Sequence, residues 1–326
     1  MNEKIKFGIL GYGKISRTRF LPALRSANLA TLGAIGTQHF DKVKSNFGKD
    51  VPILSYDDLI SQGKKLIDAI YIALPNNLHT YWARKCINAG LNVLCEKPIS
   101  NDPNSVKKCI DLARDKDVLF AEAFMYRTDN RHEEVRKMIE NGFIGDVHLL
   151  EATFSYFLDD LNNIRLKKEN WGGALMDIGC YGIDVARLIT QKEPKKIFAK
   201  CLKGKKSGVD ECVSITLIFE SKIIALITAS TCLKRENYYK IRGSKGIIKV
   251  PDSFVPKDKE ERFIVIEKDT GEKIVKNFPG ANAFEDEIDL FSKAVKLKDN
   301  SLLYPLENGL ANSYLLNKAI KSMKEE

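Results

Sequence analysis

The sequence contains little of what marks metal or membrane proteins. Its four histidines share no ligand spacing with one another or with the seven cysteines, and no C-x-x-C pair occurs, so no metal site is expected. Most of the cysteines lie in apolar contexts, which predicts small buried hydrophobes. No apolar run approaches the length that crosses a bilayer. The first residues form a strand-like run rather than a signal segment, so a cytoplasmic protein without a membrane partner is expected.

The positive charge of the chain is spread out rather than concentrated. The formal net charge is +9, but the densest lysine clusters are short and partly balanced by acidic residues. A nucleic-acid partner would need a concentrated basic stripe, so none is expected. A basic surface still favours anionic ligands such as nucleotides or sugar phosphates.

The length and the apolar pattern predict two domains. From residue 5 to about 122, short apolar runs alternate with helical stretches, which is typical of βαβ units around a parallel sheet. We therefore expect a Rossmann-like, doubly wound dinucleotide-binding domain over residues 1–122. After residue 123 strands follow one another without intervening helices, and two helices end the chain. This predicts an α+β domain over residues 123–326, with an open and largely antiparallel sheet for substrate binding and oligomerisation.

A glycine-rich turn follows the first predicted strand. Gly11 and Gly13 suit a tight turn and the close approach of a pyrophosphate to the next helix, and Ser16 replaces the usual third glycine or alanine. The turn residues Gly11, Tyr12, Gly13, Lys14 and Ile15 are predicted to contact the cofactor. Glycines also serve turns that bind nothing.

The end of the second predicted strand bears on the choice between NAD and NADP. An acidic residue here would bind the ribose 2′-hydroxyl of NAD, but the chain has Thr37, Gln38 and His39, followed by Lys42 and Lys44. Without a carboxylate the site would not repel a 2′-phosphate, and Thr37 could donate a hydrogen bond to it. NADP is favoured, and NAD stays open.

Polar residues follow two further predicted strands. The run that ends at Leu74 and Pro75 is followed by Asn76, Asn77 and His79, although a turn with a helix cap would also explain the asparagines, and His79 could face solvent. Lys97 follows the apolar run 92–95, at the carboxyl edge where open α/β sheets bind ligands. Burial can retune a lysine for proton transfer.

A predicted helix from about 173 to 190 carries a second candidate constellation. Two glycines open it, and Asp177 and Tyr181 lie four residues apart on one face, which Asp184 continues. A carboxylate and a phenol could bind a hydroxylated substrate, and an ammonium such as Lys97 would lower the pKa of the phenol. Alternatively, Asp177 caps a neighbour and Tyr181 only packs.

Five motifs in order carry a resemblance: the Gly-x-Gly turn, PNNLH, CEKP, EAFMYR and GGALMDIGCY. Together they resemble the glucose–fructose oxidoreductase/inositol dehydrogenase family, in the branch that has tyrosine at position 181. That branch includes dimeric dihydrodiol dehydrogenase, xylose dehydrogenase and ketosugar reductases. The resemblance implies a catalytic pair of Lys97 and Tyr181, with Asp177 orienting substrate hydroxyls. It implies cofactor contacts at Gly11, Gly13, Leu74, Pro75, Asn76, His79, Glu96 and Lys97.

The sequence therefore predicts an NAD(P)-dependent oxidoreductase acting on a hydroxyl or keto group of a sugar or sugar derivative. Arg165 is a candidate substrate contact, although it could be a surface arginine. Trp171 stands where the family usually has a first glycine, and Thr37-Gln38 replaces a Ser-Arg pair. The alternatives are an NADP-binding sensor without chemistry and an NAD-dependent glycosidase. A homodimer or homotetramer through the C-terminal sheet is expected.

Overall fold

The computed structural model describes residues 3–47, 50–220 and 222–324. The chain forms two compact units. Unit 1 comprises Met1–Met125 and Phe284–Ser313, and unit 2 comprises Tyr126–Ala283 and Tyr314–Glu326. The predicted boundary at 122/123 lies close to the observed crossing into unit 2, but residues 284–313 cluster with unit 1.

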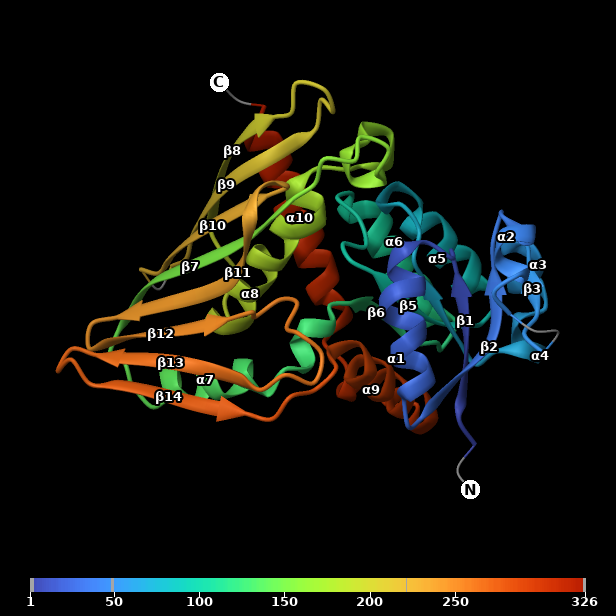
Figure 1. The fold of residues 1–326 in the computed structure, drawn as a ribbon, viewed down its shortest axis with the longest axis horizontal. Coiled ribbons are helices and arrows are strands. Elements are labelled where there is room, and N and C mark those ends of the chain that lie inside the picture. The colour runs from blue at the N-terminus through green and yellow to red at the C-terminus, as the bar shows by residue number, and fades with distance from the viewer. Residues whose placement is uncertain (1–2, 48–49, 221, 325–326) are drawn as a thin grey trace. The chain divides into compact units, whose positions relative to one another are not determined.

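Unit 1 contains a parallel sheet with the strand order β3-β2-β1-β4-β5-β6, which is the Rossmann order (Figure 1). This confirms the predicted fold class. The third strand has only two residues, too few to show a pattern in the sequence. The strands are β1 (Ile5–Leu10), β2 (Ala30–Gly36), β3 (Ile53–Leu54), β4 (Ala69–Ile72), β5 (Asn92–Glu96) and β6 (Phe120–Ala123).

Helices cover both faces of this sheet, as the continuous apolar runs of its strands require. On one face, Trp82, Cys86 and Cys109 from α5 and α6 pack against buried strand residues. On the other, the ring of Phe7 contacts Phe20 and Phe291. The helices described in unit 1 are α1 (Leu21–Ser26), α2 (Phe40–Lys44), α3 (Tyr56–Ser61), α4 (Gly63–Leu66), α5 (His79–Asn88), α6 (Pro103–Asp115) and α9 (Ala283–Leu297), with a π-helical turn, η1 (Ser16–Phe20), before α1.

Unit 2 contains a sheet with the order β14-β13-β12-β11-β7-β10-β9-β8 (Figure 1). Every neighbouring pair is antiparallel except β7 and β10, which are parallel, so the prediction of a largely antiparallel sheet is confirmed. The strands are β7 (Val147–Phe157), β8 (Lys196–Lys203), β9 (Asp210–Ile218), β10 (Ile224–Ser230), β11 (Cys232–Gly243), β12 (Gly246–Pro251), β13 (Arg262–Lys268) and β14 (Lys273–Phe278).

One face of this sheet is covered by the helix that carries the candidate site. The π-helical turn η6 (Leu175–Gly179) leads directly into α8 (Cys180–Thr190). A Cβ at Gly182 would overlap the side chain of Ile227 on β10, so this glycine lets α8 lie close to the sheet. The other helices are α7 (Asn130–Glu140) and α10 (Leu306–Ser322), whose last residues belong to unit 2. Across the described ranges, no helix has the length and apolar character that a membrane span requires.

Candidate active site

The glycine turn after β1 has the geometry of a phosphate-binding turn. Gly11 has a φ of +100°, and a Cβ there would lie 2.6 Å from the carbonyl oxygen of Ala73 and 2.7 Å from Leu74 Cδ2. Only glycine fits this position without strain. A Cβ at Gly13 would meet nothing within 4 Å, so its absence leaves open space beside the backbone. The turn therefore fits the pyrophosphate of a dinucleotide.

Ser16, at the imperfect position of the fingerprint, has a structural role. Its side chain is buried, and Oγ donates to the carbonyl oxygen of Gly11 over 2.6 Å. A glycine or alanine could not make this bond. The serine thus fastens the start of η1 to the turn, and the departure from the motif does not weaken the turn.

The region expected to distinguish NADP from NAD contains a nearly buried threonine. Thr37 is 3% exposed, and its Oγ1 accepts a hydrogen bond from the backbone N–H of His39 over 3.0 Å. The hydroxyl proton of Thr37 is not used in that bond. The side chain of Lys42 lies outside what the structure describes. Tyr12, in the glycine turn, contacts the ring of Phe47 at a centroid distance of 5.5 Å.

The strand register of the parallel sheet in unit 1 brings the predicted cofactor residues to one edge of that sheet. Leu10 pairs with Ile72, and Ile72 pairs with Cys95. Because these strands are parallel, the segments that follow them leave the sheet on the same side. Gly11, the turn that carries Leu74 and Pro75, and Lys97 therefore share the carboxyl edge of the sheet, as predicted.

Two carboxylates fix the backbone around Lys97. Glu96 accepts hydrogen bonds from the phenol of Tyr71 and from the backbone N–H of Lys97, the latter over 3.2 Å. Glu122, at the end of β6, accepts from the N–H of Ile99 over 3.0 Å. Tyr71 and Glu122 were not among the predicted site residues. The signal that could have found Glu122 is its place near the carboxyl end of β6, the strand next to β5, within the EAFMYR motif.

His79 is buried, so the alternative of a solvent-facing histidine is wrong. Its Nδ1 lies 2.9 Å from the carbonyl oxygen of Pro98, and its Nε2 lies 2.8 Å from that of Leu74. Burial lowers the pKa of His79, and the charge of Lys97 lowers it further. His79 therefore lies between the turn after β4 and the turn after β5, and its neutral ring donates to one of the two carbonyl oxygens.

The asparagines after Pro75 are not helix caps, contrary to the alternative interpretation. Pro75 and Leu78 occupy the two N-cap positions in this segment, and neither makes a capping bond through its side chain. Within the described residues, Oδ1 of Asn77 is buried without a hydrogen-bond partner. A cap therefore does not account for the asparagines.

In unit 2 the two glycines that precede η6 are required by their neighbours. A Cβ at Gly172 would overlap the carbonyl of Arg165, and a Cβ at Gly173 would overlap the carboxylate of Asp210. Gly173 also has a φ of +116° and donates its N–H to the Arg165 carbonyl over 2.8 Å. Trp171 has a φ of +52°, in the left-handed region that glycine adopts without strain. This backbone conformation explains why a glycine would suit position 171.

Asp177 lies within the π-helical turn and forms a compact polar cluster. Arg165 donates from Nε to Asp177 Oδ1 over 2.9 Å, and the phenol of Tyr156 donates to the other carboxylate oxygen. Burial raises the pKa of Tyr156, and the adjacent carboxylate raises it further, so this phenol remains a hydrogen-bond donor. Arg165 is therefore part of this cluster, and the alternative of a surface arginine without a role does not describe it. Asp177, Arg165 and Tyr156 form a unit suited to binding hydroxyl groups.

Tyr181 lies among three aromatic rings that we call the aromatic enclosure: Tyr126, Phe154 and Phe254. Their centroids lie 5.6, 5.5 and 5.6 Å from that of Tyr181, which is 3% exposed. Phe154 and Tyr156 are two residues apart on β7, so their side chains share one face of the strand. Asp177 and Tyr181 are therefore both directed at that face, as their spacing predicted.

Asp184 has a structural role rather than extending the site. Arg127 donates to its carboxylate from two nitrogens, the Nε bond measuring 2.9 Å, and the phenol of Tyr126 donates to it as well. All three side chains are almost fully buried. The Asp184 cluster fixes Tyr126, and through it one wall of the aromatic enclosure.

Asp210 closes the start of the site helix. Its Oδ2 accepts from the N–H of Leu175 over 2.7 Å, which satisfies one unpaired donor of the helix start. Burial raises the pKa of Asp210 to about 6, although the bond from Leu175 opposes that shift.

Most of the site residues that the sequence analysis did not predict are aromatic, or lie far from Tyr181 in the sequence. Tyr156 and Phe154 lie on a strand whose inward face showed only apolar alternation, and Phe254 lies in a loop without a motif. Tyr126 and Arg127 belong to EAFMYR, which was noted as a motif without a role for either residue. What places these five side chains is the packing of β7, α8 and the segment after β12.

Comparison with known proteins gives two family matches. Residues 5–124 match the oxidoreductase family with an NAD-binding Rossmann fold, GFO/IDH/MocA, and residues 132–249 match a C-terminal domain of the same family. A trans-1,2-dihydrobenzene-1,2-diol dehydrogenase of Xenopus tropicalis is 32% identical, over 79% of this chain and 80% of that protein. An NADP-linked D-xylose 1-dehydrogenase of Haloferax volcanii is 28% identical, over 89% of each chain.

Among solved structures, a 3-ketoreductase from Actinomadura kijaniata has a similar fold. That structure contains NADP and TDP-benzene. It superposes with a TM-score of 0.91 at 26% identity, covering 98% of each chain. The similarity extends over both units, so it is not confined to the common nucleotide-binding fold.

Proposed function

This chain belongs to the GFO/IDH/MocA oxidoreductase family and is an NAD(P)-dependent enzyme that acts on hydroxyl or keto groups of sugar derivatives, and we propose that Lys97, Tyr181 and Asp177 carry the reaction. The observation that supports this proposal most directly is the arrangement of residues at the carboxyl edge of the parallel sheet in unit 1. There the glycine turn and Lys97 share the carboxyl edge of the sheet, with β4 between their strands, and each is fixed by its own hydrogen bonds.

The cofactor supplies a nicotinamide that accepts or gives a hydride. Gly11 and Gly13 would hold its pyrophosphate, because neither has a Cβ to block the approach. The remaining predicted contacts are proposed on their place at the same edge: Tyr12, Lys14, Ile15, Thr37, Leu74, Pro75, Asn76, His79 and Glu96. Thr37 provides a hydroxyl and no carboxylate, so NADP is the preferred cofactor.

The proton moves through Tyr181. In oxidation the phenolate of Tyr181 takes the proton of the substrate hydroxyl, and in reduction the phenol returns a proton to the alkoxide oxygen. Lys97 is the proposed partner of Tyr181, because an ammonium favours the phenolate form of a phenol. Its place in a turn held by Glu96 and Glu122 preorganises it for that role.

Asp177 and Arg165 bind the substrate. The carboxylate accepts hydrogen bonds from sugar hydroxyls, and the guanidinium orients it. Tyr156 holds the second carboxylate oxygen, so Asp177 has a fixed direction. The chemistry of this cluster suits a polyhydroxylated ligand rather than an apolar one.

A cofactor absorbance assay tests the proposal with NAD⁺ and NADP⁺ across aldoses, inositols and sugar nucleotides. We expect turnover that depends on added cofactor and is faster with NADP⁺. Tyr181→Phe should lose about 10²–10⁴-fold in kcat while cofactor affinity stays nearly unchanged. The matched control is Tyr314→Phe, because Tyr314 is an exposed tyrosine on α10. Unchanged turnover in Tyr181→Phe would end the assignment of this residue.

The open face of the sheet in unit 2 is the proposed oligomer interface, in a homodimer or homotetramer. Phe198 pairs with Thr216, and Thr216 pairs with Leu226, so Phe198 and Leu226 share a face. Both are exposed, as are Phe157 and Leu202. A second copy of this chain would cover these side chains. In sedimentation equilibrium, Leu226→Lys should lower the mass of the assembly, whereas Thr270→Lys in the β13–β14 turn should not.

We also propose a cytoplasmic location. All seven cysteines are free thiols, including the exposed Cys232. Exposed thiols persist in a reducing compartment. Fractionation of cells that express the tagged chain would test this.

A further inference from the structure

The segment 251–255, which starts at the last residue of β12, places one aromatic ring against Tyr181. Phe254 is fully buried, and its centroid lies 5.6 Å from the rings of Tyr181, Tyr126 and Phe154 alike. It is the member of the aromatic enclosure that comes from a loop rather than from a strand or helix packed in the core. Its position therefore depends on what holds the loop.

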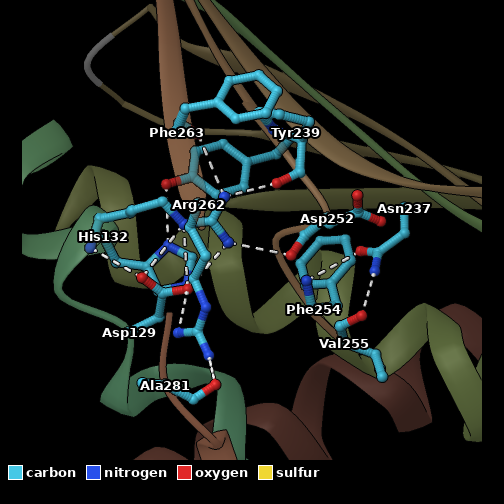
Figure 2. A network of polar contacts seen from close by, with 12 residues as sticks. Asp129, His132, Asn237, Tyr239, Asp252, Phe254, Val255, Arg262, Phe263 and Ala281 are labelled. Carbon is cyan, nitrogen blue, oxygen red and sulfur yellow. Dashed lines mark hydrogen bonds and ion pairs between the residues drawn. The ribbon is translucent and has the colours of Figure 1, made fainter. Parts of the chain in front are cut away.

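The first anchor of this segment is a buried guanidinium. Arg131, on α7, is 1% exposed and donates from Nη1 to the carbonyl of Pro251 over 2.7 Å and from Nη2 to that of Asp252 over 3.0 Å. Asp129 accepts from Nε and Nη2 of Arg131, so its carboxylate faces that guanidinium. Asp129 also accepts from Nη1 of Arg262, a second guanidinium (Figure 2).

The second anchor is an asparagine that binds backbone groups of Phe254 and of the next residue. Asn237, on β11, accepts from the N–H of Phe254 over 2.9 Å and donates to the carbonyl of Val255 over 3.2 Å (Figure 2). Asp252, between the two anchors, has a φ of +45°, which turns the segment inward. Four backbone groups in this short stretch are therefore bound by side chains rather than by strand pairing.

The cost of this arrangement argues for a function beyond packing. Buried charges destabilise a protein unless every partner is in place, and here an ion cluster of three residues lies behind a loop. The adjacent Ser253 is buried with an Oγ that has no partner in the described residues. A leucine on a regular strand would fill the same volume without these features. What the anchors provide is a fixed position for a ring beside Tyr181.

We propose that Phe254 is a positioning residue for Tyr181, with Asn237 and Arg131 as the anchors that hold it; this inference rests on the proton-transfer role proposed for Tyr181. The ring restricts Tyr181 to one orientation and keeps water from the phenol. Small displacements of a reacting group reduce rates strongly, by about a hundredfold for 1 Å. Water also stabilises a phenolate, so a ring that excludes water from Tyr181 bears on how readily the phenol gives up its proton.

The test uses Phe254→Leu and Asn237→Ala in the full-length enzyme. Phe254→Leu should lower kcat by about tenfold to a hundredfold, with cofactor KM nearly unchanged. In Tyr181→Phe, one limb of the pH profile of kcat/KM should disappear. In Phe254→Leu, the same limb should move to lower pH, because water then reaches the phenol of Tyr181. Asn237→Ala keeps the ring and loosens its anchor, so it should change kcat and the pH limb in the same direction by less. Phe143→Leu, at an exposed phenylalanine, is the control.

The double variant Phe254→Leu/Tyr181→Phe separates positioning from a general loss of structure. If Phe254 acts through Tyr181, the double variant should be no slower than Tyr181→Phe alone. Wild-type kcat and pH limb in both Phe254→Leu and Asn237→Ala, with Tyr181→Phe inactive, would overturn this inference and leave the proposed function standing. An active Tyr181→Phe would overturn the proposed function, and this inference with it. If Phe254→Leu fails to fold, Asn237→Ala decides: an altered melting temperature with unaltered kinetics would refute positioning.

Discussion

Arg165 and Asp177 form an ion pair through Nε and Oδ1 over 2.9 Å, with the carboxylate almost fully buried and the guanidinium one-third exposed. The pair joins the 3-10 helix η4 (Ile164–Leu166) to the π-helical turn of the site helix. An arginine that fixes a carboxylate from one side leaves a directed acceptor, which is what recognition of sugar hydroxyls needs. Its geometry leads to the first prediction.

Arg165→Met should raise KM for the sugar by about tenfold or more, with a smaller change in kcat. The variant removes the charge that orients Asp177 but leaves the proton-transfer residues in place. Arg165→Lys should restore little, because a lysine lacks the Nε geometry. Steady-state kinetics over a range of sugar concentrations would check this, with the exposed Arg25→Met as the control. An effect confined to kcat would contradict the binding role.

Thr37→Asp should shift cofactor preference from NADP toward NAD. An aspartate can still accept the N–H of His39, but its charge would repel a 2′-phosphate and attract a ribose hydroxyl. We expect the ratio of kcat/KM for NADP to that for NAD to fall by at least about tenfold, which corresponds to about 1.4 kcal/mol. Thr37→Ser, which keeps the hydroxyl, should retain the NADP preference. An unchanged ratio in Thr37→Asp would place the 2′-phosphate elsewhere.

Asp129→Asn should lower the free energy of unfolding by about 3–5 kcal/mol, because Arg131 and Arg262 would be left buried without a counter-charge. Burial opposes the charge of Asp129, but the bonds from Arg131 outweigh it, so the pKa of Asp129 lies below its usual value. Its stabilising contribution is therefore present above the unfolded pKa and lost as pH falls through the folded one. Chemical denaturation would measure both effects. The surface variant Glu133→Gln should leave the denaturation midpoint unchanged.

Asp210→Asn should reduce the pH dependence of stability between about pH 4 and 7. The pKa of Asp210 is raised to about 6 in the folded state, so its contribution is full below the unfolded pKa and lost as pH rises through 6. The amide oxygen of asparagine can still accept from Leu175. We therefore expect the melting temperature of Asp210→Asn, relative to wild type, to be higher at pH 8 than at pH 4.5. An equal difference at both pH values would show that Asp210 does not titrate in this range.

The sequence supported the fold well because its strongest signals are local. Short apolar runs separated by helical stretches predict a parallel sheet, and consecutive strands without helices predict the second sheet. The two-residue β3 left no such signal. Membership of residues 284–313 in unit 1 depends on contacts such as Phe7 with Phe291, which no local pattern contains.

The candidate site was predicted less completely. The place of Gly11 and Lys97 at the carboxyl edge could be predicted because a glycine turn and a strand end have fixed places in an α/β sheet, whereas their roles stay predictions. The environment of Tyr181 was not, since Phe154 and Phe254 come from segments whose register is decided only by folding. Asp184 was assigned to the same face as Asp177, but its partner Arg127 could not be read from spacing. Arg127 and Tyr126 lie in the EAFMYR motif, but the motif alone does not indicate which carboxylate they bind.

The return of residues 284–313 to unit 1 has a consequence for biosynthesis. Asp289 accepts hydrogen bonds from the backbone N–H groups of Asn28 and Leu29, and Phe291 covers Phe7. During translation the nascent nucleotide-binding half emerges early, yet the apolar surface around Phe7 stays uncovered until residues 284–313 have left the ribosome. In that interval the growing chain is open to chaperones and to aggregation, and a prematurely terminated product would carry the same exposed surface.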